Sequence, residues 1–255
     1  MNADLRLAAG LGLLLALAVG CQTIMRLRVR TAVVTASARA FVQLAAVGLA
    51  VRLVFAAPAA CAAVLAVMAT VAAHTAARRL SRLPGAGRAV VIAIVAAAAL
   101  TLGVLFAVPA LPRSARYLVA LGGSVLGGTM TACTLAGRRL LDGLLQRRDE
   151  VEAWLALGAT PRQAVADIAR TAATEALLPA LDQTRTVGLV TLPGAFVGAL
   201  LGGASPTEAA RFQLVVLISL LAAETYAAAI LVWLLGAPTQ LPAMDHQQTT
   251  GRRAT

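Results

Sequence analysis

The stretch from Arg138 to Arg185 organises the whole chain, and it reads RRLLDGLLQRRDEVEAWLALGATPRQAVADIARTAATEALLPALDQTR. It holds 7 of the 11 acidic residues and 7 of the 22 arginines of the chain. Long runs of Ala, Leu, Val and Gly lie on either side of it. Charged side chains are costly inside a bilayer, so this polar, helix-patterned block predicts a segment that meets water and a water-soluble partner.

The composition around this block is that of a membrane protein. The chain has 255 residues, of which 60% are hydrophobic and only 13% are charged, and its mean hydropathy is +0.83. A soluble domain carries about 25% charged residues. Apolar runs of about 20 residues, the length that spans a bilayer as a helix, recur along the chain. The sequence therefore predicts an all-α, polytopic integral membrane protein.

Runs of this kind occur at seven places, and the sixth is shorter and is interrupted by Gly and Pro. We expect about seven transmembrane helices in one membrane domain, residues 1–235, with the polar block 138–185 inserted between the fifth and sixth. The tail 236–255 is polar, contains Pro238 and Pro242, and is predicted to be disordered. The expected spans cover residues 7–24, 38–55, 59–76, 89–108, 117–136, 187–201 and 212–235.

The arginines predict the orientation of these spans. They gather in alternate connections, at 26–30, 78–88, 138–185 and 252–253, and are sparse in the other connections. Because positive charge stays on the cytoplasmic side, we expect the N-terminus outside and the polar block and C-terminus inside, in the cytoplasmic membrane. The formal net charge of +11 then comes from arginines that set the topology. We expect contact with membrane lipids and no nucleic-acid partner.

The chain contains no lysine. A phosphate-binding loop of the P-loop type requires one, so ATP that drives this protein must bind another polypeptide. We expect no cofactor and no catalytic residue in the chain, which is therefore not predicted to be an enzyme. Its three cysteines, Cys21, Cys61 and Cys133, lack the spacing of a zinc site and are expected to be free.

Helix start and stop signals divide the polar block. Asp149 and Glu150 suit a first helical turn, Gly158 is a natural stop, and Thr160 with Gln163 forms a capping-box pattern. Two short helices meeting at a corner near 158–160 are predicted, a knob that fits a groove in another protein; an ordinary loop is the alternative. The residues expected at this contact are Glu152, Trp154, Leu157, Gly158, Ala159, Thr160, Pro161 and Arg162.

Polar groups within apolar spans are candidates for a membrane pathway, because they are costly there without a function. Glu224, deep in the seventh span, either binds a cation or stays neutral and hydrogen-bonded. Gln43 has an interhelical hydrogen bond as its alternative role. For Met130 the choice lies between a soft metal contact and, more favoured, core packing. Which metal ligands exist, if any, stays open.

The sixth span is both polar and breakable. Pro193 removes a backbone donor and frees carbonyls, which favours a span that lines a transport cavity over one that is simply kinked. Asp182 and Arg185 are three residues apart, which favours a structural ion pair over a substrate contact. With the polar residues of the other spans and those around the sixth span taken together, the pathway candidates are Gln43, Met130, Asp182, Arg185, Thr186, Gly188, Thr191, Pro193, Gly194 and Glu224.

Several motifs resemble known transporters. Glu152-Ala153 with Gly158 resembles the "EAA" loop of ABC-importer permeases, although Trp154 replaces the second Ala. A closer resemblance is to the iron-export ABC transporter permease family (FetB-like), which is related to plant aluminium-tolerance permeases. The matching motifs lie at 157–161, 177–179, 187–194 and 211–213, and Gly128 stands where that family has Asn in a Gly-Asn-x-Met motif.

The resemblance implies an ABC transporter permease subunit that exports metal ions, iron among them. It implies a permease homodimer carrying two separate ATPase subunits, which bind the ATP and Mg and drive transport through a coupling region at 149–182. Two other classes remain open from the residues alone. Glu224 and the interrupted sixth span favour a secondary transporter driven by an ion gradient, and a membrane scaffold subunit without transport is the third possibility.

Overall fold

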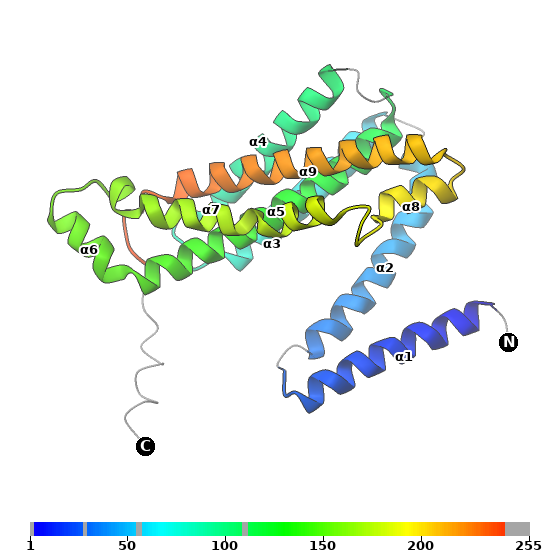
Figure 1. Cartoon of the computed structure of the whole chain (residues 1–255), viewed down its shortest axis with the longest axis horizontal. Helices are drawn as coiled ribbons and strands as arrows, with labels where there is room; N and C mark the ends of the chain where they lie inside the picture. Colours follow the sequence, from blue (N-terminus) through cyan, green and yellow to red (C-terminus); the bar gives the residue numbers. More distant parts are fainter. Residues whose placement is uncertain (1–2, 28–29, 55–57, 109–111, 243–255) are drawn as a thin grey trace. The chain divides into compact units, whose positions relative to one another are not determined.

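The computed structural model describes residues 3–27, 30–54, 58–108 and 112–242. Helices make up almost all of this part of the chain, and its only β-type pairing is an isolated bridge between Val187 and Thr191. The all-α prediction is therefore confirmed. The helices (Figure 1) are α1 Ala3–Ile24, α2 Arg30–Val54, α3 Pro58–Arg79, α4 Ala86–Ala107, α5 Ala115–Gln146, α6 Arg148–Ala156, α7 Pro161–Thr186, α8 Gly194–Leu201 and α9 Pro206–Leu235.

Six helices of the described chain are long and apolar enough to cross a membrane, namely α1 to α5 and α9. This confirms a polytopic membrane protein but corrects the expected span at 187–201. Residues 187–193 form a turn, and α8 has only 8 residues, about 12 Å at 1.5 Å per residue, against a bilayer core of about 30 Å. Gly188 in the left-handed region (φ 79°) and Pro193, which lacks a backbone donor, end the helical run.

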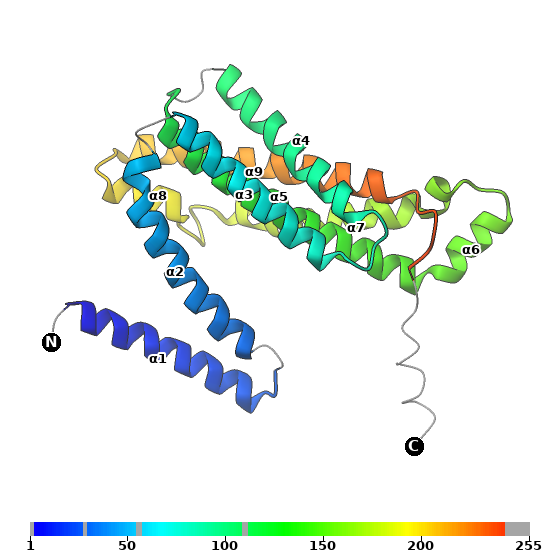
Figure 2. The same ribbon diagram turned by 180° about the vertical axis from the view of Figure 1, so that it is seen from behind.

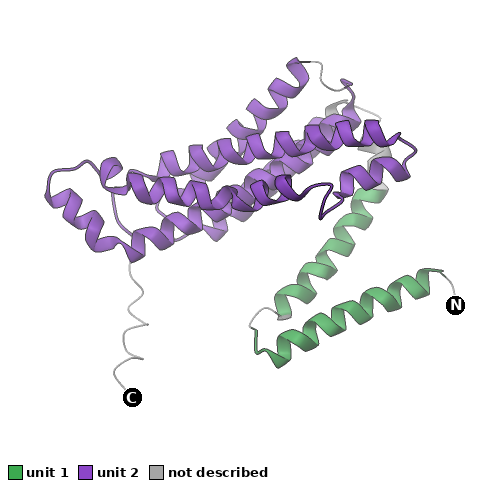
Figure 3. Ribbon diagram, in the orientation of Figure 1, with its two compact units in different colours: residues 1–60 green, residues 61–255 purple. Residues whose placement is uncertain are grey.

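The chain forms two compact units, residues 1–60 and residues 61–255 (Figure 3). The first contains α1 and α2, which pack against each other. Helix α1 buries none of its own residues, and Gln43 lies exposed on α2. The pathway role expected for Gln43 therefore stays a prediction.

In the second unit α9 is the central helix, and it packs against α4, α5, α7 and α8. Helices α5 and α9 run in the same direction, because Tyr117 stacks edge-on against Phe212 near their N-terminal ends and Cys133 meets the Ala227 carbonyl further along. Helix α7 runs the opposite way along α5, because Arg139 pairs with Glu175 and Gly143, further along α5, lies against Ile168, nearer the start of α7. Figures 1 and 2 show α5, α7 and α9 side by side from both directions.

Small residues let these helices approach closely. Most of the buried core consists of alanine with valine and leucine. A side chain at Gly122 or Gly123 would collide with Leu65 or Met68 of α3, and one at Gly143 would collide with Ile168 of α7. Close helix contact through small residues is the usual way in which membrane helices pack, since lipid offers no hydrophobic driving force between them.

The polar block is folded differently from the prediction. It is not a separate loop, because α5 continues through Arg138 to Gln146 and α7 returns along α5 and α9. The expected second short helix has 26 residues, about 39 Å. Its stripe of small apolar residues continues past Pro179, whose ring lies on the exposed side. Seven residues of this stripe are buried, namely Ala164, Val165, Ile168, Ala169, Ala172, Ala176 and Ala180.

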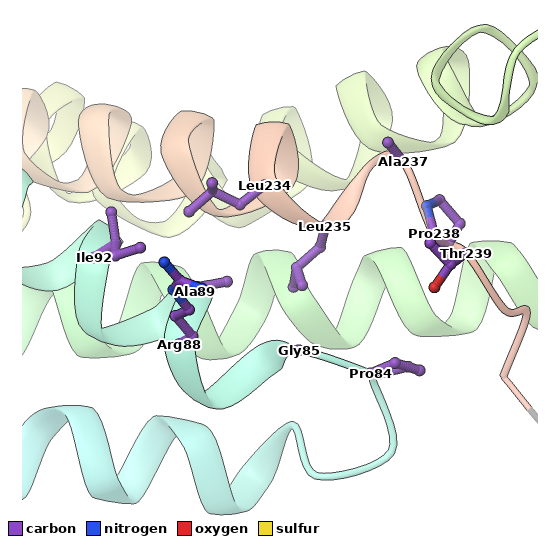
Figure 4. A pocket seen from close by; sticks show the side chains of 10 residues that line it. All are labelled: Pro84, Gly85, Arg88, Ala89, Ile92, Leu234, Leu235, Ala237, Pro238 and Thr239. Carbon is purple, nitrogen blue, oxygen red and sulfur yellow. The ribbon is translucent and has the colours of Figure 1, made fainter.

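The described part of the segment after α9, residues 236–242, packs against the helices of the second unit. Pro242 is buried, and its carbonyl accepts a hydrogen bond from Arg148 Nη1 (3.3 Å). Pro238 and Thr239 also line a cavity of about 410 Å³ with Arg88 and Ile92 of α4, shown in Figure 4. The remainder of the expected tail, 243–255, lies outside the described residues.

Candidate functional site

The corner between α6 and α7 is built by local capping. Asp149 and Glu150 occupy the first turn of α6, and Gly158 adopts φ 88°, which an L side chain rarely tolerates. The Thr160 backbone N–H donates to Gln163 Oε1 (2.9 Å), and the Gln163 N–H donates to Thr160 Oγ1 (3.4 Å). The predicted capping box, with Pro161 at the first helical position, is confirmed.

The corner presents apolar side chains to its surroundings. Leu157 is 81% exposed, Trp154 is 49% exposed and Leu155 is 38% exposed, whereas Val151 is buried and anchors α6. These exposed groups lie among charged residues rather than within an apolar span. Contiguous exposed apolar surface with a polar rim is typical of a protein-binding site.

Arginines hold the corner to the bundle. Arg147 donates to Glu150 (2.7 Å) and to Asp167 (2.6 Å), so it joins the starts of α6 and α7. These hydrogen bonds from Arg147 lower the pKa of Glu150 and raise the pKa of Arg147. Because the pKa of Glu150 is lowered on folding, its stabilising effect is present at neutral pH and disappears as the pH falls through that lowered value. Arg148 pairs with Glu152 (2.7 Å) one turn further along α6.

A second contact links the corner to the far end of α9. Arg162 Nη1 donates to the Trp233 carbonyl (3.0 Å), and the Arg162 guanidinium lies 4.8 Å from the centre of the Trp233 ring. The hydrogen bond and the cation–π contact act on one residue, so they fasten the start of α7 to the end of α9.

The interrupted segment, residues 187–193, lies at the other end of α7. Its turn is closed by backbone hydrogen bonds from Gly188 N–H to the Thr191 carbonyl (2.8 Å) and from Val190 N–H to the Thr186 carbonyl (2.9 Å). Pro193 precedes α8 without a side-chain cap, and Gly194 begins that helix. Asp182 and Arg185 form the expected ion pair (3.9 Å) on exposed side chains.

Glu224 lies half-buried on α9, directly against Gly128 of α5. A Cβ atom at position 128 would lie 2.8 Å from Glu224 Oε1, so glycine at 128 leaves room for the carboxylate. Met130 packs against the apolar core, as its favoured alternative predicted. Among the described residues, no group of three or more His, Cys, Asp or Glu side chains could hold a metal ion.

Comparison with known proteins shows the family of this chain. Residues 4–238 match the family described as "Uncharacterised protein family (UPF0014)". The chain belongs to the UPF0014 family. It is 36% identical over 221 residues to "UPF0014 membrane protein STAR2" of Oryza sativa subsp. japonica, covering 86% of this chain and 78% of that protein. No solved structure gives a significant match.

Two further relatives carry informative names. The chain is 36% identical over 152 residues to "Protein ALUMINUM SENSITIVE 3" of Arabidopsis thaliana, covering 60% of this chain and 56% of that protein. It is 30% identical over 198 residues to "Probable iron export permease protein FetB" of Escherichia coli (strain K12), covering 77% of this chain and 76% of that protein. The family resemblance inferred from the motifs is thereby confirmed.

The structure groups most of the predicted site residues in three places of the second unit, whereas Gln43 lies on α2 in the first unit and Met130 lies on α5. The coupling candidates all lie at the α6–α7 corner, while Asp182 to Gly194 lie at the other end of α7. Glu224 stands apart from both, against Gly128. Sequence reasoning missed Trp233 and Asp167 as partners of the corner. It also missed Gln213 as a buried polar group, although Gln213 belongs to the 211–213 motif and is a glutamine next to an apolar run.

Proposed function

We propose that this UPF0014 protein is the permease subunit of an ABC transporter and exports metal ions, with iron the first candidate. The observation that carries the proposal is the α6–α7 corner, which exposes Leu157 and Trp154 and is held by Arg162 to the end of α9. The name of the Escherichia coli relative, a probable iron export permease, supports the substrate.

The corner would dock into a groove of a separate ATPase subunit. Without lysine the chain has no P-loop of its own, so ATP and Mg would bind the ATPase. The contact surface would consist of Glu152, Trp154 and residues 157–162, with the coupling region extending over 149–182. A helical knob in a groove is a common mode of protein recognition.

Movement of the corner would reach the membrane pathway through two helices. Helix α7 connects the corner rigidly to the interrupted segment, and the Arg162–Trp233 contact connects it to α9. Both routes end near polar groups in the second unit, namely Thr186 to Gly194 on one and Glu224 on the other. A switch between inward and outward states would therefore change the spacing of these two groups.

The proposed setting is a bacterial-type inner membrane. The positive-inside rule would place the N-terminus outside and the corner, with the C-terminus, in the cytoplasm. A homodimer surrounded by lipid, carrying two ATPase subunits, would complete the pathway. The apolar side chains left exposed on α1 and α2 support burial of this unit against lipid or a second copy.

The central test is reconstitution. We expect a Walker-type ATPase to co-purify with the chain, and vesicles containing both to export Fe²⁺ from a panel of metal ions only when ATP is supplied. Metal movement without ATP, at the same rate as with it, would contradict the proposal.

Glu224 supports a second candidate, a transporter driven by an ion gradient, because a carboxylate deep in a span is costly without a function. Glu224→Gln distinguishes its roles in the same vesicles. A loss of transport assigns the carboxylate to cation or proton movement, whereas full transport assigns a neutral, hydrogen-bonded role. Gly128→Ala is the companion variant. The Cβ at position 128 would displace the Glu224 carboxylate without changing the charge of that carboxylate.

A further inference from the structure

A cavity of about 410 Å³ lies between the start of α4, the end of α9 and the segments that adjoin them. Both helices are long and apolar enough to cross a membrane, so the cavity lies where two spans meet the boundary between lipid and water. Its volume falls within the range of about 300–1,000 Å³ that small-molecule sites occupy. Figure 4 shows Arg88 and Ile92 on its α4 side and Leu234, Leu235 and Pro238 on its α9 side.

The wall of this cavity carries a positive charge that no acidic side chain balances. Arg88 lines the cavity and is exposed, and its guanidinium has no ion-pair or hydrogen-bond partner among the described residues. Residues 5–141 and 225–244, which include the whole lining, contain no Asp or Glu. Three more arginines lie in the connection that leads into α4, namely Arg78, Arg79 and Arg82. An anionic group is therefore the expected ligand at this end of the cavity, and a guanidinium suits a phosphate best.

The start of α4 adds backbone donors to the arginine. Gly85, which precedes the helix and lines the cavity, adopts φ 77°, and no side chain caps the first turn. That turn contains no acidic residue either. The first N–H groups of a helix lack partners within the helix and favour an anion, so they reinforce the charge of Arg88.

The remaining wall is apolar and leads into the membrane span. Ile92 lines the cavity and is 40% exposed, and Val95 follows it about one turn further along α4 with 50% exposure. Leu234 of α9 lines the same wall. A free phosphate ion or an acidic protein surface would gain nothing from these side chains, whereas the acyl chain of a lipid would cover them.

We propose that this cavity binds the headgroup of an anionic phospholipid, with the phosphate at Arg88 and an acyl chain along Ile92 and Val95. Basic pockets between membrane helices on the cytoplasmic side are typical sites for such headgroups. The site goes beyond the proposed transport function, since its ligand belongs to the surrounding bilayer. Leu234 directly follows Trp233, which contacts Arg162, so a bound lipid also supports the end of α9 to which the α6–α7 corner is fastened.

The test measures lipid binding to the purified full-length chain in detergent by native mass spectrometry. Dioleoylphosphatidylglycerol, which is anionic, is expected to bind more tightly than dioleoylphosphatidylcholine. Arg88→Gln should weaken phosphatidylglycerol binding about fivefold, the equivalent of about 1 kcal/mol for one arginine at a headgroup, and leave phosphatidylcholine binding unchanged. Arg211→Gln, at an exposed position near the opposite end of α9, is the matched control and should bind both lipids as the unaltered chain does.

A second variant tests the cavity without altering Arg88. Thr239→Glu places a carboxylate in the same wall, on an exposed position beyond α9, and should weaken phosphatidylglycerol binding by a similar factor. Both variants should unfold at the temperature of the unaltered chain in phosphatidylcholine, because the replaced side chains are exposed. Added phosphatidylglycerol should raise the unfolding temperature of the unaltered chain more than that of either variant.

Three outcomes would overturn the lipid site. The first is equal affinity of the unaltered chain for the two lipids, and the second is an equal loss of phosphatidylglycerol binding in Arg88→Gln and Arg211→Gln. The third is binding of inorganic phosphate alone as tightly as phosphatidylglycerol, which would assign the cavity to a free anion instead.

Discussion

The α6–α7 corner and the interrupted segment use the same backbone device in two different settings. Each has a glycine in the left-handed region, Gly158 at φ 88° and Gly188 at φ 79°. Each is followed by a proline next to the start of the following helix, Pro161 or Pro193. They differ in what holds them.

The corner is fixed by side chains, whereas the interrupted segment is closed by its backbone. A capping box and the ion pairs of Arg147 and Arg148 surround the corner, but α8 begins without a side-chain cap. Leu189 is 89% exposed at the tip of the interrupted segment. We infer that the corner moves as a rigid body while the interrupted segment changes shape, as expected of a driven element and a gate.

The largest effect is expected at Gly158. Gly158→Pro forces φ to about −65° where the corner needs a positive value, so the corner cannot form. We expect transport and the stimulation of ATPase activity to fall to background, with membrane insertion unchanged by protease mapping. Unchanged transport would remove the coupling role from the corner. Gly127→Ala, at a helical position with open space around it, is the control for loss of a glycine.

The equivalent change in the interrupted segment should have a different signature. Gly188→Ala introduces strain of roughly 1–2 kcal/mol at a positive φ. We expect transport to fall by about tenfold while ATPase binding and stimulation remain, because the corner is intact. Loss of ATPase binding in this variant would show that the interrupted segment cannot be altered without also disturbing the α6–α7 corner.

Arg162 tests the connection between the two regions. Arg162→Ala removes both contacts with Trp233 and is expected to lower transport per ATP hydrolysed about fivefold, corresponding to roughly 1 kcal/mol of coupling free energy. Arg162→Lys keeps the charge but loses the planar guanidinium contact, so it should restore transport only in part. The ratio of transport to hydrolysis in vesicles measures this effect, and an unchanged ratio in Arg162→Ala would exclude the α9 route.

The smallest expected effect concerns the cap. Thr160→Ala removes one member of the capping box and should destabilise the start of α7 by about 1 kcal/mol. Amide hydrogen exchange is then expected to become faster at Gln163 and Ala164 and to stay unchanged at residues 187–193. Faster exchange at the interrupted segment would contradict the rigid-body description of α7.

The corner was predictable because its signals are local. Thr160, Pro161 and Gln163 lie within four positions, and acidic residues mark the first turn of α6. The full length of α7 was not predictable in this way. The charged residues as far as Arg185 suggested a boundary between a polar block and the next span, whereas α7 is one helix from Pro161 to Thr186 with Pro179 inside it.

Contacts between distant positions lay beyond what the sequence can show. Arg162 and Trp233 are 71 positions apart, and neither residue type specifies the other. Gly128 could be recognised as a departure from the family motif, but only the packing of α5 on α9 reveals that Glu224 occupies the space beside it. The cavity beside Arg88 likewise depends on how the end of α9 and the segment after it lie against α4.

One measurement tests the central claim, that the corner is where the ATPase engages the chain. A photo-crosslinking amino acid is placed at Leu157, and separately at Leu201 at the other end of the unit, in membranes that contain the co-purifying ATPase. These side chains are matched in exposure, at 81% and 85%. The account predicts a permease–ATPase adduct from position 157 and none from position 201. An adduct from position 201, or none from position 157 in an actively exporting membrane, would contradict it.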